Sequence, residues 1–254
     1  HPVHPAGLVI LVLILLMGFL AKKAFCSWAC PVGTVSEMLA SVGQRLFRRT
    51  LNLPRWLDLP LRGFKYLGLG FFLYQILWLM PLPGLRALLA SPYHLIADIR
   101  LLQFFRSPSA TALIVITVIA LLCLLVQMAW CRYLCPYGAL LGVLSLLSLS
   151  RIHRETATCI RCGICSRRCP AWLPVREKRT IRSAECYGCY RCVHNCPVDG
   201  TLSMRVAGRW VLPSALFGVA LVVLFIAVDL YGRLTGNWET SAHPLQLFRL
   251  LRGS

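Results

Sequence analysis

Two closely spaced runs of cysteine carry the clearest chemical signal in the sequence. The segment CIRCGICSRRCP begins at Cys159 and the segment CYGCYRCVHNCP begins at Cys186. Each has the spacing Cys-x2-Cys-x2-Cys-x3-Cys-Pro. Thiolates bind both zinc and iron–sulfur clusters, but structural zinc sites need only Cys-x2-Cys pairs. A fourfold spacing that occurs twice therefore favours iron–sulfur clusters over zinc.

The fourth cysteine of each run predicts how the ligands are shared. In two-cluster sequences with this spacing, the fourth cysteine binds the cluster of the other run. We therefore predict two [4Fe-4S] clusters. The ligands of the first are Cys159, Cys162, Cys165 and Cys196. The ligands of the second are Cys186, Cys189, Cys192 and Cys169. We expect Gly163 and Gly188 to relieve crowding where backbone amides approach the sulfurs.

A second group of cysteines forms an internal repeat. AFCSWACPVG, at 24–33, and AWCRYLCPYG, at 129–138, share the order Ala, aromatic, Cys, x3, Cys, Pro, x, Gly. Cysteines four apart lie on one face of a helical turn, which the proline then ends. We predict one additional redox or metal site from Cys26, Cys30, Cys131 and Cys135. The alternative is that these four thiols are unligated and fill helix ends. The isolated Cys123 is expected to be a small buried hydrophobe.

The composition indicates the kind of chain that positions these cysteines. Hydrophobic residues make up 57% of its 254 residues and charged residues 14%. The apolar residues gather in stretches of roughly 20, the length that a bilayer requires of a helix. The four predicted spans are Ala6–Phe25, Leu61–Met80, Ala110–Trp130 and Val211–Tyr231. We thus predict an all-α polytopic membrane protein with about four transmembrane helices and an inserted small α+β two-cluster ferredoxin-like domain.

Three domains follow from this division. Residues 1–150 are the predicted membrane domain with three spans and both Cys-x3-Cys-Pro repeats, 151–205 the ferredoxin domain, and 206–254 the fourth span with an outward-facing tail. The apolar spacing of 34–50 predicts an amphipathic helix on the membrane surface. A start at His1, with no signal peptide evident, is compatible with a fragment of a longer protein.

Charge predicts the orientation. Residues 22–65 contain eight Lys and Arg and residues 131–210 contain thirteen, whereas 81–108 contain three. By the positive-inside rule, the two rich segments face the cytoplasm. Lys22 and Lys23 are expected to reach from the first span to the lipid headgroups. The net charge of +18 then reflects membrane orientation, and nucleic acid is not an expected partner. A reducing cytoplasm also disfavours a disulfide framework.

Two Cys-x3-Cys-Pro repeats followed by a tandem ferredoxin run resemble the membrane polyferredoxin family. That family includes the quinol-oxidising membrane ferredoxin of periplasmic nitrate reductase systems and the C-terminal half of the nitrous oxide reductase accessory protein. The resemblance covers about 6–203. It implies bound [4Fe-4S] clusters, a multi-pass place in the bacterial inner membrane, and contact with quinone or quinol and with a redox partner subunit.

The function that we predict is electron transfer. The protein would relay electrons between the quinone pool or a cytoplasmic donor and a respiratory, extracytoplasmic reductase. A quinol dehydrogenase subunit of anaerobic respiration is one form that this function can take. No residue is assigned as a catalytic acid, base or nucleophile, because the clusters supply the chemistry. The alternatives are a redox maturation factor for a partner metalloenzyme and an iron–sulfur regulatory sensor.

Overall fold

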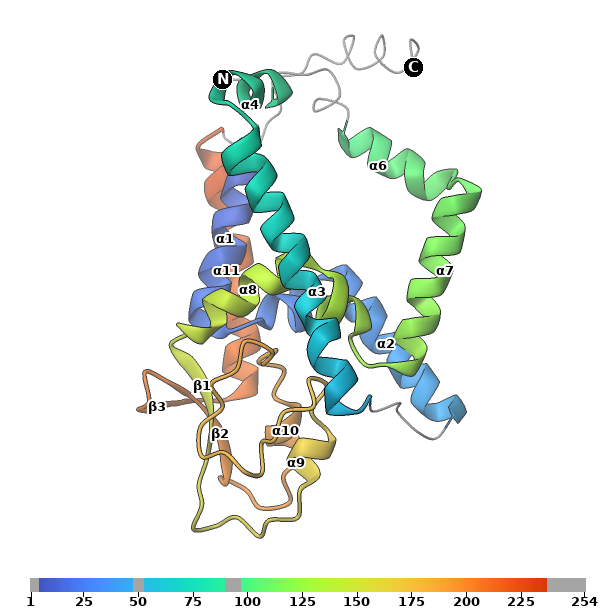
Figure 1. Ribbon diagram of the computed structural model, residues 1–254. Helices are drawn as coiled ribbons and strands as arrows, with labels where there is room; N and C mark the ends of the chain where they lie inside the picture. Colours follow the sequence, from blue (N-terminus) through green and yellow to red (C-terminus); the bar gives the residue numbers. More distant parts are fainter. Residues whose placement is uncertain (1–4, 48–52, 90–96, 237–254) are drawn as a thin grey trace.

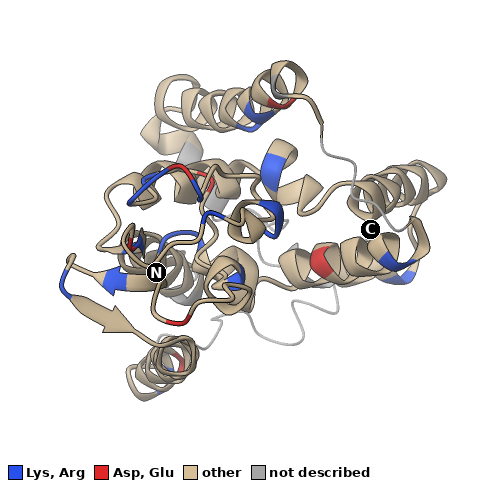
Figure 2. Ribbon diagram, turned by 90° about the horizontal axis from the view of Figure 1, so that it is seen from below, with Lys and Arg blue, Asp and Glu red and all other residues tan. Residues whose placement is uncertain are grey.

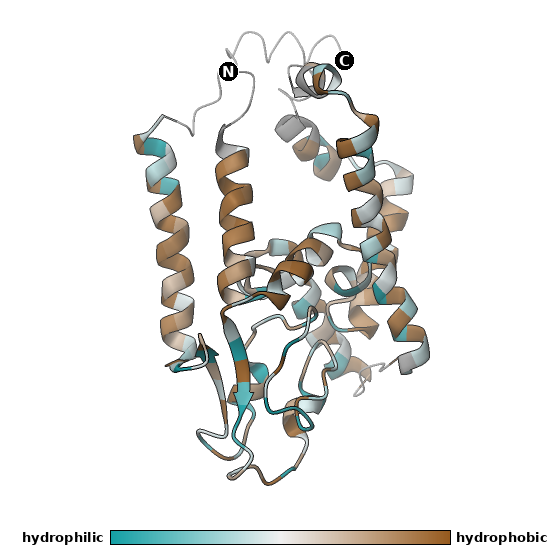
Figure 3. Cartoon of the chain, turned by 60° about the vertical axis from the view of Figure 1, so that its left-hand side comes forward, coloured by the Kyte–Doolittle hydropathy of each residue, from teal (hydrophilic) through white to brown (hydrophobic). Residues whose placement is uncertain are grey.

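The computed structural model describes residues 5–47, 53–89 and 97–236. The chain forms a helical part and, at one end of it, a small domain that contains the sheet and the two cysteine runs (Figure 1). Hydrophobic residues dominate several of the helices, while hydrophilic residues gather in the small domain (Figure 3).

The first half of the chain is helical. Its elements are α1 (Pro5–Ala21), the π-helical turn η1 (Phe25–Ala29), α2 (Pro31–Phe47), α3 (Arg55–Tyr74), the π-helical turn η2 (Gln75–Leu79), α4 (Leu82–Leu89) and α6 (Ala97–Arg106). The second half begins with α7 (Ala110–Leu125), the π-helical turn η3 (Trp130–Leu134) and α8 (Pro136–Leu146). The small domain follows, and α11 (Ser214–Leu234) comes after it.

The two Cys-x3-Cys-Pro repeats fold alike and pack crosswise. Each consists of a helix, a π-helical turn and a second helix that begins at the proline, namely α1–η1–α2 and α7–η3–α8. The first helix of each repeat packs against the second helix of the other, so α1 contacts α8 and α2 contacts α7. This crosswise packing brings η1 and η3, with their cysteines, into the middle of the helical part.

The prediction of a four-span polytopic protein is wrong. Among the described residues, only α11 is both long and apolar enough to cross a membrane. The helix α1 has 17 residues and α7 has 16. At 1.5 Å per residue these reach about 25 Å, short of a hydrocarbon layer of about 30 Å. The helix α3 has 20 residues, but it contains two charged residues, Asp58 and Lys65, that are buried inside the protein.

The predicted windows failed because they ran past the ends of the helices. The chain leaves α1 at Lys22, which has a left-handed φ of 59°, and it turns again at Met128, with φ 55°, after α7. Apolar residues continue beyond both breaks, but they belong to the π-helical turns. Hydropathy alone does not detect such breaks.

The amphipathic helix predicted at 34–50 corresponds to α2, and its last three residues lie outside the described part. The side of α2 that packs inward consists of small residues, Gly33, Ser36, Ala40 and Gly43. Its outer side exposes a row of larger apolar residues, Val32, Val35, Met38, Val42 and Leu46.

The small domain has a three-stranded antiparallel sheet. Its strands are β1 (Ser150–Arg154), β2 (Leu202–Val206) and β3 (Trp210–Leu212), and β2 lies in the middle. The register pairs Ile152 with Met204, and both side chains are buried. The two cysteine runs lie between β1 and β2 and include one short helix each, α9 (Ile164–Arg167) and α10 (Arg191–His194).

Candidate iron–sulfur sites

The structure gathers the cysteines of the small domain around two cavities. One cavity is lined by Cys159, Cys162, Cys165 and Cys196. The other is lined by Cys169, Cys186, Cys189 and Cys192. Each cavity thus receives three cysteines from one run and the fourth from the other run. These are the two sets that the spacing predicts.

The two runs have the same backbone conformation at matching positions. The residue before the second cysteine is left-handed in both, with φ 56° at Arg161 and 62° at Gly188. The residue after the second cysteine is also left-handed, with φ 77° at Gly163 and 57° at Tyr190. Left-handed residues within a turn direct successive N–H groups to one side, where they form a concave site for an anionic group. Glycine, as predicted, occupies one of these two positions in each run, at Gly163 and Gly188. The other position holds Arg161 in the first run and Tyr190 in the second.

Backbone amides reach the cysteine sulfurs in both sites. A hydrogen bond from the backbone of Arg161, the largest cause, lowers the pKa of Cys159. Burial raises the pKa of Cys169 to about 11 and that of Cys189 to about 12, although backbone N–H groups of Leu173 and Arg191 act in the opposite direction. Buried thiols of this kind become thiolates when a metal supplies the compensating charge.

The two cavities differ in their surroundings. The cavity at Cys186 is enclosed by apolar residues, Ile152, Leu173, Val175 and Ile181. The cavity at Cys159 is lined by Arg154, Arg161 and Arg176, and its ligand candidate Cys162 is exposed. Exposure, net charge and hydrogen bonds to sulfur set cluster potentials. The first site is thus the one nearer to the protein surface, and the second lies inside.

The Cys-x3-Cys-Pro repeats place their cysteines on π-helical turns rather than on an ordinary helical turn as predicted. Cys30 N–H donates to the carbonyl of Phe25 at 2.8 Å, and Cys135 N–H donates to the carbonyl of Trp130 at 2.9 Å. Both are bonds across five residues, the π-helical pattern, which occurs often at functional sites. Both second cysteines then adopt an extended conformation that turns the chain into the next helix.

The glycine that ends each repeat permits a close backbone approach. A Cβ on Gly33 would lie 1.9 Å from the carbonyl oxygen of Cys26, and one on Gly138 would lie 2.9 Å from that of Cys131. Both distances are shorter than a side chain tolerates. The glycines thus let the second helix of each repeat fold back against the cysteine turn.

The four repeat cysteines lie close enough to influence each other. Burial, the largest cause, raises the pKa of Cys26 to about 12, and the charges of Cys135 and Cys30 raise it further. Burial also raises the pKa of Cys131, with added contributions from Cys26, Cys135 and Cys30. Among the described residues, no three Cys, His, Asp or Glu side chains converge on one point as a single metal ion requires. Cys123 is buried, as predicted, and accepts a hydrogen bond from Ser36 Oγ at 3.3 Å.

A buried charged group links the repeats to the small domain. Lys65 Nζ lies 2.6 and 2.7 Å from the two carboxylate oxygens of Glu185, and Lys23 Nζ lies 3.2 Å from one of them. Burial by itself raises the pKa of Glu185, but the charges of Lys23 and Lys65 outweigh it and hold the pKa below its ordinary value. Lys22 and Lys23 were predicted to reach the lipid headgroups, which is wrong, since both are buried inside the protein.

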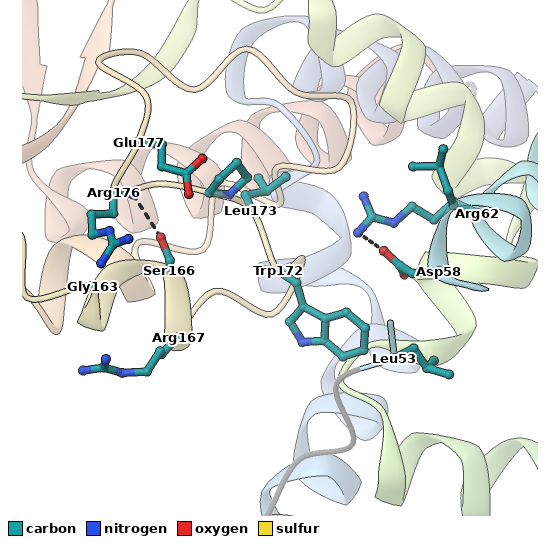
Figure 4. A pocket seen from close by; sticks show the side chains of 12 residues that line it. Leu53, Asp58, Arg62, Gly163, Ser166, Arg167, Trp172, Leu173, Arg176 and Glu177 are labelled. Carbon is teal, nitrogen blue, oxygen red and sulfur yellow. Dashed lines mark hydrogen bonds and ion pairs between the residues drawn. The ribbon is translucent and has the colours of Figure 1, made fainter. Parts of the chain in front are cut away.

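Basic residues outnumber acidic residues in the chain, 27 to 9. Figure 2 views the molecule from the end that carries the small domain and marks the basic residues blue and the acidic residues red. A large cleft on this side is lined by α3 residues Asp58 and Arg62, by Trp172, and by Arg167 and Arg176 of the small domain (Figure 4). The cleft also reaches Gly163, which lies between two cysteines of the first site. Within the small domain, Ser166 Oγ accepts a hydrogen bond from the backbone N–H of Arg176 at 2.9 Å.

Sequence reasoning missed the residues that join the two groups of cysteines. Tyr187, Glu185 and Lys65 carry no motif, and their partners are more than a hundred positions away in the chain. One signal was available, because Arg62 and Lys65 interrupt a predicted span. Charged residues within an apolar stretch indicate buried partners.

Comparisons with known proteins bear directly on both groups of cysteines. The family described as "4Fe-4S binding domain" matches residues 3–54 and 109–155, which hold the two Cys-x3-Cys-Pro repeats. The family described as "4Fe-4S dicluster domain" matches residues 151–197. No solved structure matches the chain.

Several curated proteins are similar over most of the chain. YccM of Escherichia coli (strain K12), whose assignment to electron transport is provisional, is 43% identical over 98% of this chain and 71% of its own length. The ferredoxin-type protein NapH of the same strain is 29% identical over 78% of this chain and 67% of its own length. The regulatory protein NosR of Pseudomonas aeruginosa is 27% identical over 67% of this chain but only 23% of its own length.

The cysteine-lined cavities and the matching families define a ferredoxin-type 4Fe-4S protein. The similarity to YccM and NapH identifies its family. The chain belongs to the membrane polyferredoxin-like family and is an electron-transfer protein of that family.

Proposed function

We propose that the chain relays electrons through two [4Fe-4S] clusters in residues 151–205, with the ligands exchanged between the two cysteine runs. The observation that carries the proposal is the pair of cavities, each lined by three cysteines of one run and the fourth of the other. A cubane cluster supplies the one-electron chemistry when bound. The protein's residues supply the thiolates, the amide hydrogen bonds and the surrounding charge.

The exchange of ligands is tested by paired substitutions in the full chain, purified without oxygen. Cys162→Ser and Cys196→Ser should remove the same EPR signal, although these positions lie in different runs. Cys189→Ser and Cys169→Ser should remove the other signal. If Cys196→Ser instead removed the signal that Cys189→Ser removes, each run would bind its own cluster and the exchange would be excluded.

A third iron–sulfur centre at Cys26, Cys30, Cys131 and Cys135 completes the proposed relay. Three observations support it: the four thiols influence one another, two π-helical turns of matching geometry present them, and the 4Fe-4S binding family covers both repeats. Replacing Cys26 and Cys131 together by serine should lower the bound iron while both ferredoxin signals persist. Unchanged iron would show that these cysteines only fill space.

The proposed electron path runs from the membrane to the surface of the small domain. The helix α11 anchors the protein in the bacterial inner membrane, and the small domain faces the cytoplasm. The third centre takes electrons from a quinol and passes them to the buried second cluster and then to the exposed first cluster, or the reverse, for a respiratory reductase. The position of the first cluster beside the Arg-lined cleft supports an exchange with a partner at that surface (Figure 4).

Quinol coupling has a direct test. In anaerobic proteoliposomes, a short-chain menaquinol should reduce the bound clusters of the wild-type protein, as followed by visible absorbance. The variant with Cys26 and Cys131 replaced should be reduced more slowly, while dithionite should reduce its remaining clusters fully. If dithionite reduced the clusters of both proteins but menaquinol reduced neither, a soluble electron donor would be favoured instead.

A further inference from the structure

Tyr187 lies where the second cluster site meets the repeat cysteines. It follows Cys186 directly, and its side chain is 2% exposed. Its backbone carbonyl accepts a hydrogen bond from Ser27 Oγ at 3.0 Å, and Ser27 is the neighbour of Cys26. Lys23 Nζ lies 5.5 Å from the centre of the tyrosine ring. The tyrosine is thus held between a ligand of the second cluster and the first repeat.

The hydroxyl of Tyr187 is buried and has no hydrogen-bond partner within the described part of the protein. A buried hydroxyl without a partner costs about 1–3 kcal/mol, so such groups normally face a ligand or water. Burial raises the pKa of Tyr187 well above its ordinary value, and the charge of Cys131, followed by those of Glu185 and Cys26, adds to this effect. The geometry agrees, because Ser27 and Lys23 both contact Tyr187, and a Cβ on the adjacent Gly188 would lie 3.0 Å from the carbonyl oxygen of Ala21.

Tyr190 provides a contrast within the same loop. Its side chain is as deeply buried as that of Tyr187, but its hydroxyl donates to the carbonyl of Leu212 at 2.9 Å. The loop therefore satisfies one buried tyrosine with the protein itself and leaves the other without a partner. This difference shows that the missing partner is specific to position 187 and not a general feature of the loop.

The charges nearby also call for an anionic group. The side chains of Lys23 and Lys65 are fully buried and share the single carboxylate of Glu185. Both lysines act to lower the pKa of Cys26, against the larger effect of burial. A buried cation without a matching anion is strongly destabilising. A thiolate-ligated centre at the repeats carries negative charge and would balance the excess.

We propose that the hydroxyl of Tyr187 donates a hydrogen bond to a cysteine sulfur of the third centre, on the side of Cys26 and Cys131. The inference rests on the proposed third centre and assigns a residue that tunes it. A hydrogen bond to a ligand sulfur stabilises the reduced, more negative state of an iron–sulfur centre and so raises its reduction potential. Tyr187 is therefore a positioning residue that tunes the third centre. Because it directly follows Cys186, the hydrogen bond lies close to a ligand of the second cluster.

The test compares two conservative substitutions in the full chain, loaded with its clusters. Tyr187→Phe keeps the ring and removes only the hydroxyl, and Tyr190→Phe is the matched control. Redox titrations followed by EPR should show a lower midpoint potential of the third centre in Tyr187→Phe. The same centre in Tyr190→Phe should titrate as in the wild type, and the first ferredoxin cluster should be unchanged in both.

A second change at the same position predicts a shift of opposite sign. Incorporation of 3-fluorotyrosine at 187 makes the hydroxyl more acidic and a stronger donor, so the midpoint of the third centre should rise. The protein with 3-fluorotyrosine at 187 also tests the hydrogen bond if the Tyr187→Phe variant fails to assemble the third centre. A third centre whose midpoint does not respond to fluorination would overturn the inference. A wild-type protein with iron in the ferredoxin domain alone would instead refute the third centre on which the inference depends.

Discussion

The guanidinium of Arg132 and the carboxylate of Asp58 form a buried two-point ion pair, with Nε–Oδ1 and Nη2–Oδ2 distances of 2.9 Å each. Arg132 lies between the two cysteines of the second repeat. Its Nη1 atom also donates to the carbonyl of Pro170 at 3.0 Å, directly after Cys169. The guanidinium lies 4.0 Å from the ring centre of Trp172. One side chain thus holds the repeat cysteines, α3 and the second cluster site in a fixed arrangement.

Arg132→Met should therefore destabilise the protein by about 3 kcal/mol, the lower end of the cost of breaking a buried ion pair, since Arg62 still pairs with Asp58. The free energy of unfolding, measured by denaturant titration in detergent, checks this. Arg233→Met is the matched control, because its pair with Asp229 is exposed to solvent and should contribute little to stability. Equal losses in the two variants would contradict a special role for Arg132.

The grouping of the small-domain cysteines around two cavities could be predicted from the sequence because the spacing of the cysteines acts locally. Three cysteines within seven residues can surround only one site, and the proline after the fourth turns the chain toward the other site. The structure brings the predicted residues together around two cavities. The similar fold of the two repeats could likewise be predicted, because their sequences match, and the structure packs α1 against α8 and α2 against α7.

The spans and the buried charges could not be predicted in the same way. A hydropathy window counts apolar residues but does not register a left-handed residue such as Lys22 or Met128, where a helix ends. The partners of Lys65 and Arg132 depend on tertiary packing, which a sequence pattern does not contain. Lys23 was assigned to lipid headgroups because it lies near the end of a predicted span. Its partner Glu185 is 162 positions away.

Gly33→Ala should disrupt the first cysteine turn, because the added Cβ would lie 1.9 Å from the carbonyl oxygen of Cys26. We expect a loss of about 2 kcal/mol or more in the free energy of unfolding, roughly the cost of overpacking against backbone, together with less iron at the proposed third centre. Gly138→Ala should act in the same direction but more weakly, since its closest approach is 2.9 Å.

The control for the glycine substitutions is Gly63→Ala in α3. No atom lies within 4 Å of a Cβ at Gly63, and alanine favours the helix by about 1 kcal/mol. This variant should be as stable as the wild type or more so, with unchanged iron. A Gly33→Ala protein with wild-type iron and stability would show that the turn can relax around a side chain.

Glu185→Gln should change the pH dependence of stability. The pKa of Glu185 is held below its ordinary value of 4.5, so its contribution is fully present above about pH 4.5 and is lost as the pH falls through the lowered pKa. The variant leaves Lys23 and Lys65 buried without a carboxylate, which should cost about 3 kcal/mol at pH 7. The gap between variant and wild type should narrow in more acidic solution.

Urea titrations at several pH values between 7 and 3 measure this gap, which should stay constant down to about pH 4.5 and narrow below it. Glu37→Gln is the matched control, because Glu37 pairs with Arg191 in a partly exposed position. That variant should lie within about 1 kcal/mol of the wild type at every pH. A gap that already changed between pH 7 and pH 5 would mean that the pKa of Glu185 is not lowered in the folded protein.

Epitope tags on either side of α11 should report opposite sides of the membrane. Residues 131–210, before this helix, contain thirteen Lys and Arg, whereas only three follow Tyr231. The positive-inside rule therefore predicts a cytoplasmic small domain. One tag is inserted at Gly208, in the exposed turn between β2 and β3 where no atom crowds the backbone, and the other follows Thr235. In right-side-out vesicles, antibody should reach only the tag after Thr235, and permeabilisation should expose the tag at Gly208.

Antibody binding at Gly208 in sealed vesicles would reverse the orientation and place the cluster cysteines in an oxidising compartment. If both tags were on one side, α11 would not span the membrane, and the anchoring of the protein would have to be assigned to another part of the chain.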